Sequence, residues 1–157
     1  LWFSKGDKSY FDLDAVRVKQ KYPGKKYYKG PKKGEYSGNP LGKNPGDVWA
    51  IPNVKANHME KTAHPCQFPI ALAQRLVKAL CPTEGIVLDP FMGSGSTGAA
   101  AILENKDFIG IELNSSYFGI AQQRLDDAKI GLLKYREIDK PIFDPAMAGA
   151  VAKDPFV

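Results

Sequence analysis

The hydrophobic pattern in the second half of the chain predicts two amphipathic helices. Residues 69–80 carry apolar side chains three or four positions apart, with polar side chains on the opposite side. Pro82 and Gly85 are expected to end this helix. Residues 116–129 repeat the pattern, with Asn114 or Ser115 as the expected N-cap. The stripe that we expect to face inward in this second helix consists of Phe118, Ala121, Leu125 and Ala128.

Two short apolar runs alternate with these helices and predict strands. Residues 86–89 have the composition of a buried parallel strand, and residues 108–111 predict a second strand that ends at Glu112. Between them, residues 98–105 predict a helix capped by Ser96 or Thr97, and the alanines at 99–101 permit close packing on a sheet. Strands and helices in alternation are typical of an α/β fold with a parallel sheet.

The first sixty residues predict less regular structure. Residues 1–13 predict a hairpin of two short strands with a turn at 5–8. Residues 19–47 are rich in glycine and proline and poor in aliphatic side chains, so we expect a long loop of the kind that is usually functional or disordered. Residues 48–51 predict a short strand closed by Pro52, and a polar connector follows it. The segment after residue 130 predicts one strand at most, and we assign it no place.

The composition narrows the class of protein. The chain has 157 residues, of which 43% are hydrophobic and 25% charged, which is typical of one soluble globular domain. No apolar run approaches the roughly 20 residues that cross a bilayer, and no charged-then-apolar leader opens the chain, so we expect a cytoplasmic protein without membrane contact. Cys66 and Cys81, with two histidines in the chain, form neither a disulfide framework nor a zinc pattern. We therefore expect reduced thiols and no metal.

The net charge of +5 is concentrated in one segment. From Arg17 to Gly34 the chain has eight basic residues and no acidic one, and tyrosines are interleaved with them. Lysines can contact phosphates and tyrosines can stack on bases, so this loop is a candidate DNA-binding segment whose affinity falls as salt rises. The alternative is a solvated loop whose charge serves only solubility. The candidate DNA-binding residues are Arg17, Lys19, Lys21, Lys25, Lys26, Tyr28, Lys29, Lys32 and Lys33.

The residues that follow the first strand carry the most specific chemical signal. Gly93 and Gly95 let the backbone turn tightly and approach a ligand, and a helix is expected directly after them. Glu112 stands 19 residues after Gly93, at the end of the next strand, where an acid commonly holds ribose hydroxyls. We therefore expect a small cofactor that contains adenosine. A tight corner without a ligand is the plain alternative.

The same glycines allow a second interpretation. Gly93, Gly95 and Gly98 also satisfy the dinucleotide fingerprint, so an NAD site has to be weighed. In a pyrophosphate-binding turn the first glycine normally follows the strand directly, whereas here Asp89, Pro90 and Phe91 precede the glycines and Pro90 lengthens the connection. An NAD-dependent enzyme is therefore the remote alternative.

These residues also resemble a known family. The sequence Asp89-Pro90-Phe91-Met92-Gly93-Ser94-Gly95-Ser96-Thr97 resembles the cofactor motif of DNA amino-methyltransferases. Residues 64–69 resemble the second cofactor segment that precedes the glycine motif in the beta group of these enzymes, and residues 108–113 resemble their ribose-binding strand end. Residues 1–5 and 10–17 are similar to the hairpin that precedes their target-recognition region. The resemblance covers residues 1–128 in the order that the family has.

The resemblance implies a Rossmann-like, S-adenosylmethionine-dependent methyltransferase fold of the α/β class, with a partial sheet and a basic DNA-recognition loop. It implies methyl transfer from S-adenosylmethionine to the exocyclic amino group of adenine (N6), or alternatively of cytosine (N4), in double-stranded DNA. Residues 61–129 would form the cofactor-binding core and residues 18–60 a target-recognition insertion, within a single domain of residues 1–157. The cofactor-binding residues that it implies are His64, Gln67, Phe68, Asp89, Phe91, Gly93, Ser94, Gly95, Thr97 and Glu112.

One motif of the family is missing from the sequence. Members carry Asp, Asn or Ser followed by Pro-Pro and an aromatic residue, which grips the flipped base, whereas the chain has only Asn39-Pro40-Leu41, Asp144-Pro145-Ala146 and Asp154-Pro155-Phe156. In the beta group this motif precedes the matched region, so we expect an N-terminally truncated chain that is inactive alone, and we name no catalytic residue. A catalytically silent nucleic-acid-binding module is the alternative. The sequence is compatible with a partner restriction endonuclease and with a homodimer.

Overall fold

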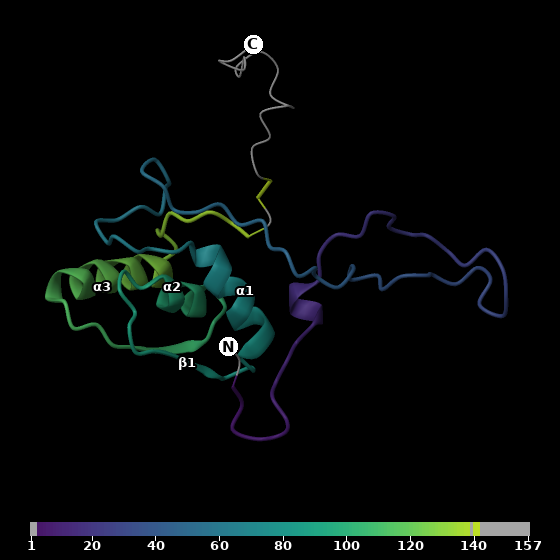
Figure 1. The fold of residues 1–157 in the computed structure, drawn as a ribbon, viewed down its shortest axis with the longest axis horizontal. Helices are drawn as coiled ribbons and strands as arrows, with labels where there is room; N and C mark the ends of the chain where they lie inside the picture. The colour runs from purple at the N-terminus through teal and green to yellow at the C-terminus, as the bar shows by residue number, and fades with distance from the viewer. Residues whose placement is uncertain (1–2, 139, 142–157) are drawn as a thin grey trace, which may run out of the picture.

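The computed structural model describes residues 3–138 and 140–141 (Figure 1). After the short 3-10 helix η1 (Asp14–Val16), regular structure begins at residue 70. The elements from there on are α1 (Ile70–Leu80), β1 (Ile86–Asp89), α2 (Ser96–Leu103), β2 (Asp107–Gly110) and α3 (Ser115–Lys129). The predicted alternation of strands and helices, and with it the α/β class, is confirmed. No helix within the described residues is long and apolar enough to cross a membrane.

The two strands form a parallel pair in which Ile86 lies opposite Asp107 and Asp89 opposite Gly110. The backbone N–H of Ile111 also donates to the Asp89 carbonyl at 3.0 Å, so the pairing continues one residue beyond β2. Figure 1 shows α1, α2 and α3 on one side of this sheet. The prediction of a parallel strand at 86–89 is therefore confirmed.

The prediction that this strand is buried is wrong. On the side of the sheet away from the three helices, Ile86 is 60% exposed, Leu88 is 61% exposed and Ile109 is 53% exposed. Side chains alternate between the two faces of a strand, so helices on one face bury only every second residue. The sheet thus has one packed face and one apolar, open face within the described part of the chain.

The core lies where α2 packs between α1 and α3. Ala99, Ala100 and Ala101 are fully buried, and Ile70 of α1 is buried beside them. Alanine has no side chain beyond Cβ, so neighbouring helices approach α2 closely. The glycine that precedes this run brings the elements closer still, because a Cβ atom built on Gly98 would lie 2.4 Å from the ring of Phe108 and 2.7 Å from Leu125.

The helix termini agree with the sequence in part. Asn114 is the N-cap of α3, as predicted, and its side-chain oxygen accepts from the N–H groups of Ser116 and Tyr117. The inward stripe is corrected at two positions. Phe118 is 42% exposed, whereas Arg124, which the hydrophobic pattern does not include, is buried. Ala121 and Ala128 are buried as expected.

The strands predicted before residue 62 are not present in the described residues. Residues 3–13 lack strand pairing and lead into η1, and the backbone N–H of Asp12 donates to the carbonyl of Ala79 at the end of α1. The predicted strand at 48–51 is likewise wrong, because no neighbouring segment in the described part of the chain pairs with it. Instead, Trp49 donates from Nε1 to the Gly46 carbonyl, and the Arg75 guanidinium lies 4.7 Å from the centroid of its ring. A strand needs a partner edge, which local sequence does not reveal.

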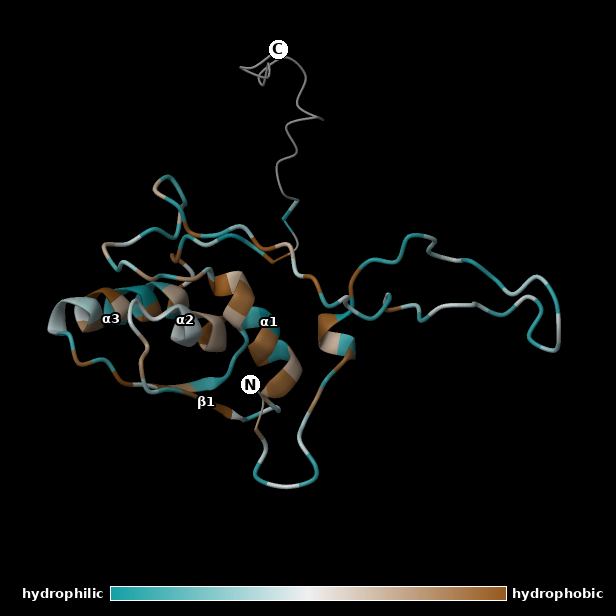
Figure 2. Ribbon diagram, viewed as in Figure 1, coloured by the Kyte–Doolittle hydropathy of each residue, from teal (hydrophilic) through white to brown (hydrophobic). Residues whose placement is uncertain are grey.

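The predicted long loop is an organised arm, which we define as residues 18–43. Val18 and Lys43 form an antiparallel bridge at its base, and Lys26 and Tyr36 form a second one farther out. Figure 1 shows the arm extending away from the helices, and Figure 2 shows that it is largely hydrophilic. The loop therefore has a defined course without a core of its own. The Asp-Pro pairs near residues 144 and 154 lie outside the described residues.

The packing at Gly98 generates a prediction about stability. We expect Gly98→Ala to lower the free energy of unfolding by about 1–3 kcal/mol, because the new methyl group collides with Phe108 and Leu125. Gly119→Ala in α3 is the matched control, since a Cβ there meets nothing within 4 Å, and we expect a gain of about 0.5–1 kcal/mol. Urea denaturation of both variants measures the difference. Equal stability of the two variants would contradict the close packing of α2.

Candidate functional site

The turn between β1 and α2 requires glycine at two positions. Gly93 has φ +52° and Gly95 has φ +77°, both in the left-handed region that side chains disfavour. Gly95 is the N-cap of α2 and no side chain caps the helix, so the prediction of Ser96 or Thr97 as the cap is wrong. The hydroxyl of Ser96 is used elsewhere, because it donates to the carbonyl of Phe68 at 2.9 Å.

Hydrogen bonds tie this glycine turn to the end of β2. The backbone N–H of Met92 donates to the carbonyl of Ile111 at 3.0 Å. The carboxylate of Glu112 accepts from the N–H of Gly93 at 3.0 Å through Oε2 and from the N–H of Asn114 at 2.8 Å through Oε1. Each carboxylate oxygen has a second lone pair, so Glu112 is held in place and can still accept bonds from hydroxyl groups.

The segment around His64 lies against the same turn. A Cβ atom built on Gly93 would come within 2.8 Å of Nε2 of His64, which places the imidazole directly beside the glycine backbone. The ring of His64 also makes an edge contact with Tyr117 of α3, with centroids 4.5 Å apart. The Phe68 carbonyl is joined to the turn through the Ser96 hydroxyl. The structure therefore brings residues 64 and 68 to the glycine turn, and their contact with a cofactor stays a prediction.

Two predicted cofactor residues are engaged inside the protein. Gln67 is 7% exposed, and its amide accepts from Thr62 and donates to the carbonyl of Glu60 at 2.6 Å. Ser94 is 3% exposed, and both its carbonyl and its hydroxyl accept from Arg124. Contact of these two side chains with a cofactor stays a prediction. Their observed bonds fix the shape of the segments on either side of the turn.

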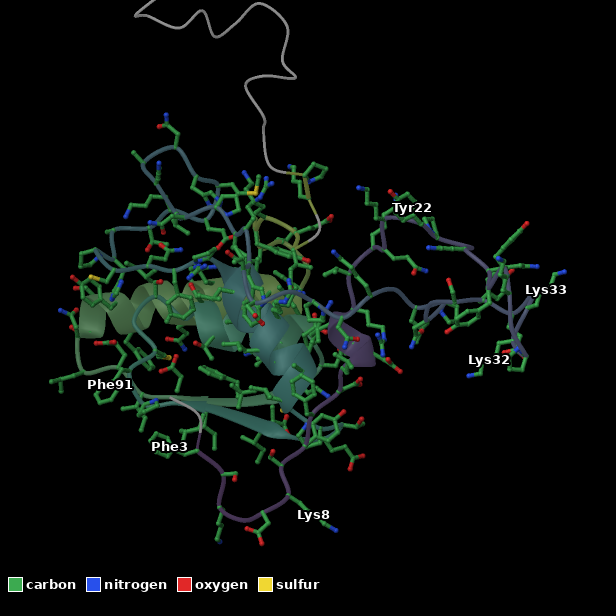
Figure 3. All side chains as sticks on the ribbon, turned by 45° about the vertical axis from the view of Figure 1, so that its right-hand side comes forward. Phe3, Lys8, Tyr22, Lys32, Lys33 and Phe91 are labelled. Carbon is green, nitrogen blue, oxygen red and sulfur yellow. The ribbon has the colours of Figure 1, made fainter. Side chains whose placement is uncertain are left out.

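The remaining predicted residues lie before and after the turn. The carboxylate of Asp89 accepts from the N–H of Phe91 at 3.0 Å, and the Phe91 side chain is exposed. Figure 3 shows Phe91 at the strand end of the molecule, far from the arm. Thr97 and Phe68 line an apolar groove of about 420 Å³ between α1 and β1. The predicted residues thus come from three separate segments that converge at the carboxyl end of the parallel strands.

The hydrophobic pattern missed three residues next to the turn. Leu113 follows Glu112 and is 99% exposed, while Tyr117 and Arg124 contact the turn and the His64 segment from α3. Positions 117, 121 and 124 recur at helical spacing, which is a detectable signal. A search for apolar side chains alone does not reveal it, because the charged Arg124 interrupts this face between Ala121 and Ala128.

The arm presents most of its predicted DNA-binding residues to solvent. Tyr28 is 82% exposed, and the ammonium of Lys26 lies 5.3 Å from the centroid of the Tyr36 ring. Figure 3 shows Lys32 and Lys33 at the far tip of the arm and Tyr22 nearer its base. The other candidates on the arm, all exposed, are Lys19, Lys21, Lys25 and Lys29. The arm therefore offers cations and aromatic rings along one extended projection.

Arg17 differs from the other basic candidates. Its guanidinium pairs with Asp14 and donates to the side chain of Asn44 at 2.7 Å and to the carbonyl of Gly42 at 3.3 Å. These bonds join the two ends of the arm just outside the bridge between Val18 and Lys43. A DNA contact by Arg17 stays a prediction. In the structure its side chain holds the two ends of the arm together.

Comparison with known proteins gives one consistent result. A family model described as DNA methylase matches residues 1–123. The chain is 52% identical over 125 residues to the type II methyltransferase M.BglII of Bacillus subtilis, covering 80% of this chain and 35% of that protein. It is 48% identical over 84 residues to the DNA adenine methyltransferase YhdJ of Escherichia coli, covering 54% and 29%. The chain spans about a third of the length of these relatives.

Among solved structures, the chain is similar to the M1.HpyAVI complex with SAM. The sequence identity is 38% and the TM-score is 0.42. The match covers 53% of this chain and 42% of that one.

The contact between the glycine turn and α3 generates a second prediction. In Gly95→Ala, the new Cβ would lie 3.0 Å from Cβ of Ala121 and 3.2 Å from its Cα, in addition to the unfavourable φ. Gly24→Ala has nearly the same φ, +79°, and meets nothing within 4 Å. We expect Gly95→Ala to cost about 1–3 kcal/mol more in urea denaturation than this control. An equal cost would mean that α3 does not confine the turn.

Proposed function

Since the chain belongs to the DNA methylase family whose members modify exocyclic amino groups, we propose that its glycine turn binds S-adenosylmethionine and that its arm binds DNA. The proposed reaction is methyl transfer to the amino group of adenine in double-stranded DNA. One observation carries this proposal. Glu112, the glycine turn and His64 meet at the carboxyl end of two parallel strands, held by the Gly93 bond to Glu112.

The geometry of the turn suits the cofactor. Ligands of open α/β sheets bind at the carboxyl ends of the strands, and an acid at the end of the second strand accepts from ribose hydroxyls. Glu112 has free lone pairs for this purpose, and the backbone N–H groups at the start of α2 suit the carboxylate of the methionine portion. Aromatic neighbours such as Phe68 favour the sulfonium. S-adenosylmethionine is the cofactor of this family, and it fits the residues present.

The proposed role of this chain in the reaction is to bind and orient. When bound, S-adenosylmethionine supplies an activated methyl group for direct displacement by the amino nitrogen. The contribution of the chain is alignment, because holding the two reacting atoms in line replaces a bimolecular encounter. Adenine is favoured over cytosine because a relative of 48% identity is a DNA adenine methyltransferase, with cytosine N4 as the alternative target. We name no catalytic residue.

The arm suits a duplex in which one base has been flipped out. A base inside a stacked duplex cannot reach the cofactor, so an enzyme of this kind must hold distorted DNA by its backbone. Exposed lysines contact phosphates, and exposed tyrosines such as Tyr28 can stack on bases. We assign target recognition to residues 18–60 and cofactor binding to residues 61–129. The type II relative suggests a restriction endonuclease as partner.

Calorimetric titration with S-adenosylhomocysteine tests the cofactor site, with NAD as the comparison ligand. We expect Glu112→Ala to weaken binding by about 1–3 kcal/mol, because the ribose hydroxyls lose their acceptor. Asp107→Ala removes an acid at the opposite end of the same strand and is expected to bind normally. Unchanged affinity in Glu112→Ala would show that this strand end does not hold the ribose. Binding of NAD without binding of S-adenosylhomocysteine would contradict S-adenosylmethionine as the cofactor of this chain.

Salt-dependent DNA binding tests the arm. The double variant Lys32→Ala/Lys33→Ala removes two charges at the tip of the arm (Figure 3). Lys129→Ala/Lys134→Ala removes two charges from residues outside the arm. We expect the tip variant to lower the slope of log K against log salt by about 1 for each phosphate that a lysine no longer neutralises, and the control to leave it unchanged. Fluorescence anisotropy over a salt series gives both slopes. A control variant that weakens binding as much as the tip variant would argue for diffuse attraction.

A further inference from the structure

One face of α3 packs against the glycine turn and the His64 segment. Tyr117 contacts the ring of His64, Ala121 lies against Gly95, and Arg124 donates to Ser94. These three positions are four and three residues apart, so they lie one above the other on the helix. The turn is therefore confined between the ends of β1 and β2 on one side and a continuous stripe of α3 on the other.

Arg124 is the polar member of this stripe. Its Nη1 donates to the Ser94 carbonyl at 2.5 Å and lies 3.2 Å from the Ser94 hydroxyl and 3.3 Å from the Ser96 hydroxyl. The residue is 7% exposed, and its Nη2 is buried with no partner in the described residues. A buried guanidinium with an unmet donor is destabilising, and apolar side chains of similar length would stabilise the core more. This cost calls for a function beyond packing.

The bond to the Ser94 carbonyl has a geometric consequence. A peptide unit is planar, so a fixed carbonyl at Ser94 also fixes the direction of the Gly95 N–H. That N–H donates to the carbonyl of Met92 at 2.7 Å and closes the turn. Arg124 thereby helps to set the orientation of the peptide between Ser94 and Gly95, although its own side chain lies behind the turn.

Glu60 supplies the opposite charge. It is 3% exposed, and its carboxylate accepts from the N–H of Ile70 at the start of α1 and from the N–H of Arg136 after α3. Burial lowers the pKa of Arg124 from its ordinary value, and the negative charge of Glu60 acts in the opposite direction. Glu60 thus links α1 and the segment after α3 and partly balances the buried cation.

We propose that Arg124 is a positioning residue for the cofactor. Its hydrogen bonds to the Ser94 carbonyl and to the hydroxyls of Ser94 and Ser96 orient the glycine turn. This inference rests on the proposed binding of S-adenosylmethionine by the glycine turn. Loss of Arg124 removes the bond to the Ser94 carbonyl and leaves the bond from the Gly95 N–H to Met92, so the turn that is proposed to hold the cofactor loses one of its restraints. The cost falls on cofactor affinity, and it exceeds what the loss of a buried arginine elsewhere would cause.

The test compares Arg124→Met, Arg124→Lys and Arg75→Met in the full chain. Calorimetry gives the dissociation constant for S-adenosylhomocysteine, and circular dichroism gives the melting temperature, with binding measured well below the lowest melting temperature. Arg75→Met is the matched control because Arg75 is on α1 and its guanidinium stacks on Trp49, away from the turn. Arg124→Lys restores the cation and one donor group without the planar fork.

We expect Arg124→Met to weaken binding roughly 10- to 100-fold, which is the loss expected for hydrogen bonds from a charged donor. Arg124→Lys should fall between Arg124→Met and the wild type, and Arg75→Met should remain within about twofold of the wild type. A folded Arg124→Met with wild-type affinity would overturn the inference, as would equal weakening by Arg75→Met. If Arg124→Met does not fold, wild-type affinity in Arg124→Lys overturns it. A wild type that does not bind S-adenosylhomocysteine refutes the cofactor site itself.

Discussion

The bond from the Gly93 N–H to the Glu112 carboxylate is the constraint on which the site depends. It joins the turn after β1 to the residue that follows β2, and the parallel register places both at the same end of the sheet. Glu112 also accepts from the N–H of Asn114, the residue that caps α3. A single carboxylate therefore fixes the turn, the strand end and the start of the next helix.

Close packing maintains this arrangement. The buried alanines of α2 allow α1 and α3 to approach from both sides, and α3 then presents Tyr117, Ala121 and Arg124 to the turn and the His64 segment. The arm is held without a hydrophobic core. Antiparallel bridges and the hydrogen bonds of Arg17 fix its course, and its lysines and tyrosines remain exposed to a partner. One chain thus combines a closely packed glycine turn with an exposed polar projection.

The sequence predicted the features that depend on local patterns. Helical spacing, the two glycines and the cap at Asn114 are properties of neighbouring residues, and the observed elements follow them. The wrong predictions involve distant partners. The strand at 48–51 lacks an edge to pair with among the described residues, the cap hydroxyl of Ser96 is taken by Phe68, and burial of Arg124 requires Ser94 and Glu60 from elsewhere in the chain. The bonds from Arg17 to Gly42 and Asn44 have the same origin.

The central claim is that S-adenosylmethionine lies at the carboxyl end of β1 and β2, between Glu112 and the His64 segment. A crystal structure of the chain with S-adenosylhomocysteine tests it most directly. We predict that the ribose hydroxyls donate to the Glu112 carboxylate and that the homocysteine portion lies along residues 93–95. A ligand bound elsewhere, with the Glu112 carboxylate facing only its two backbone N–H partners, would contradict this claim.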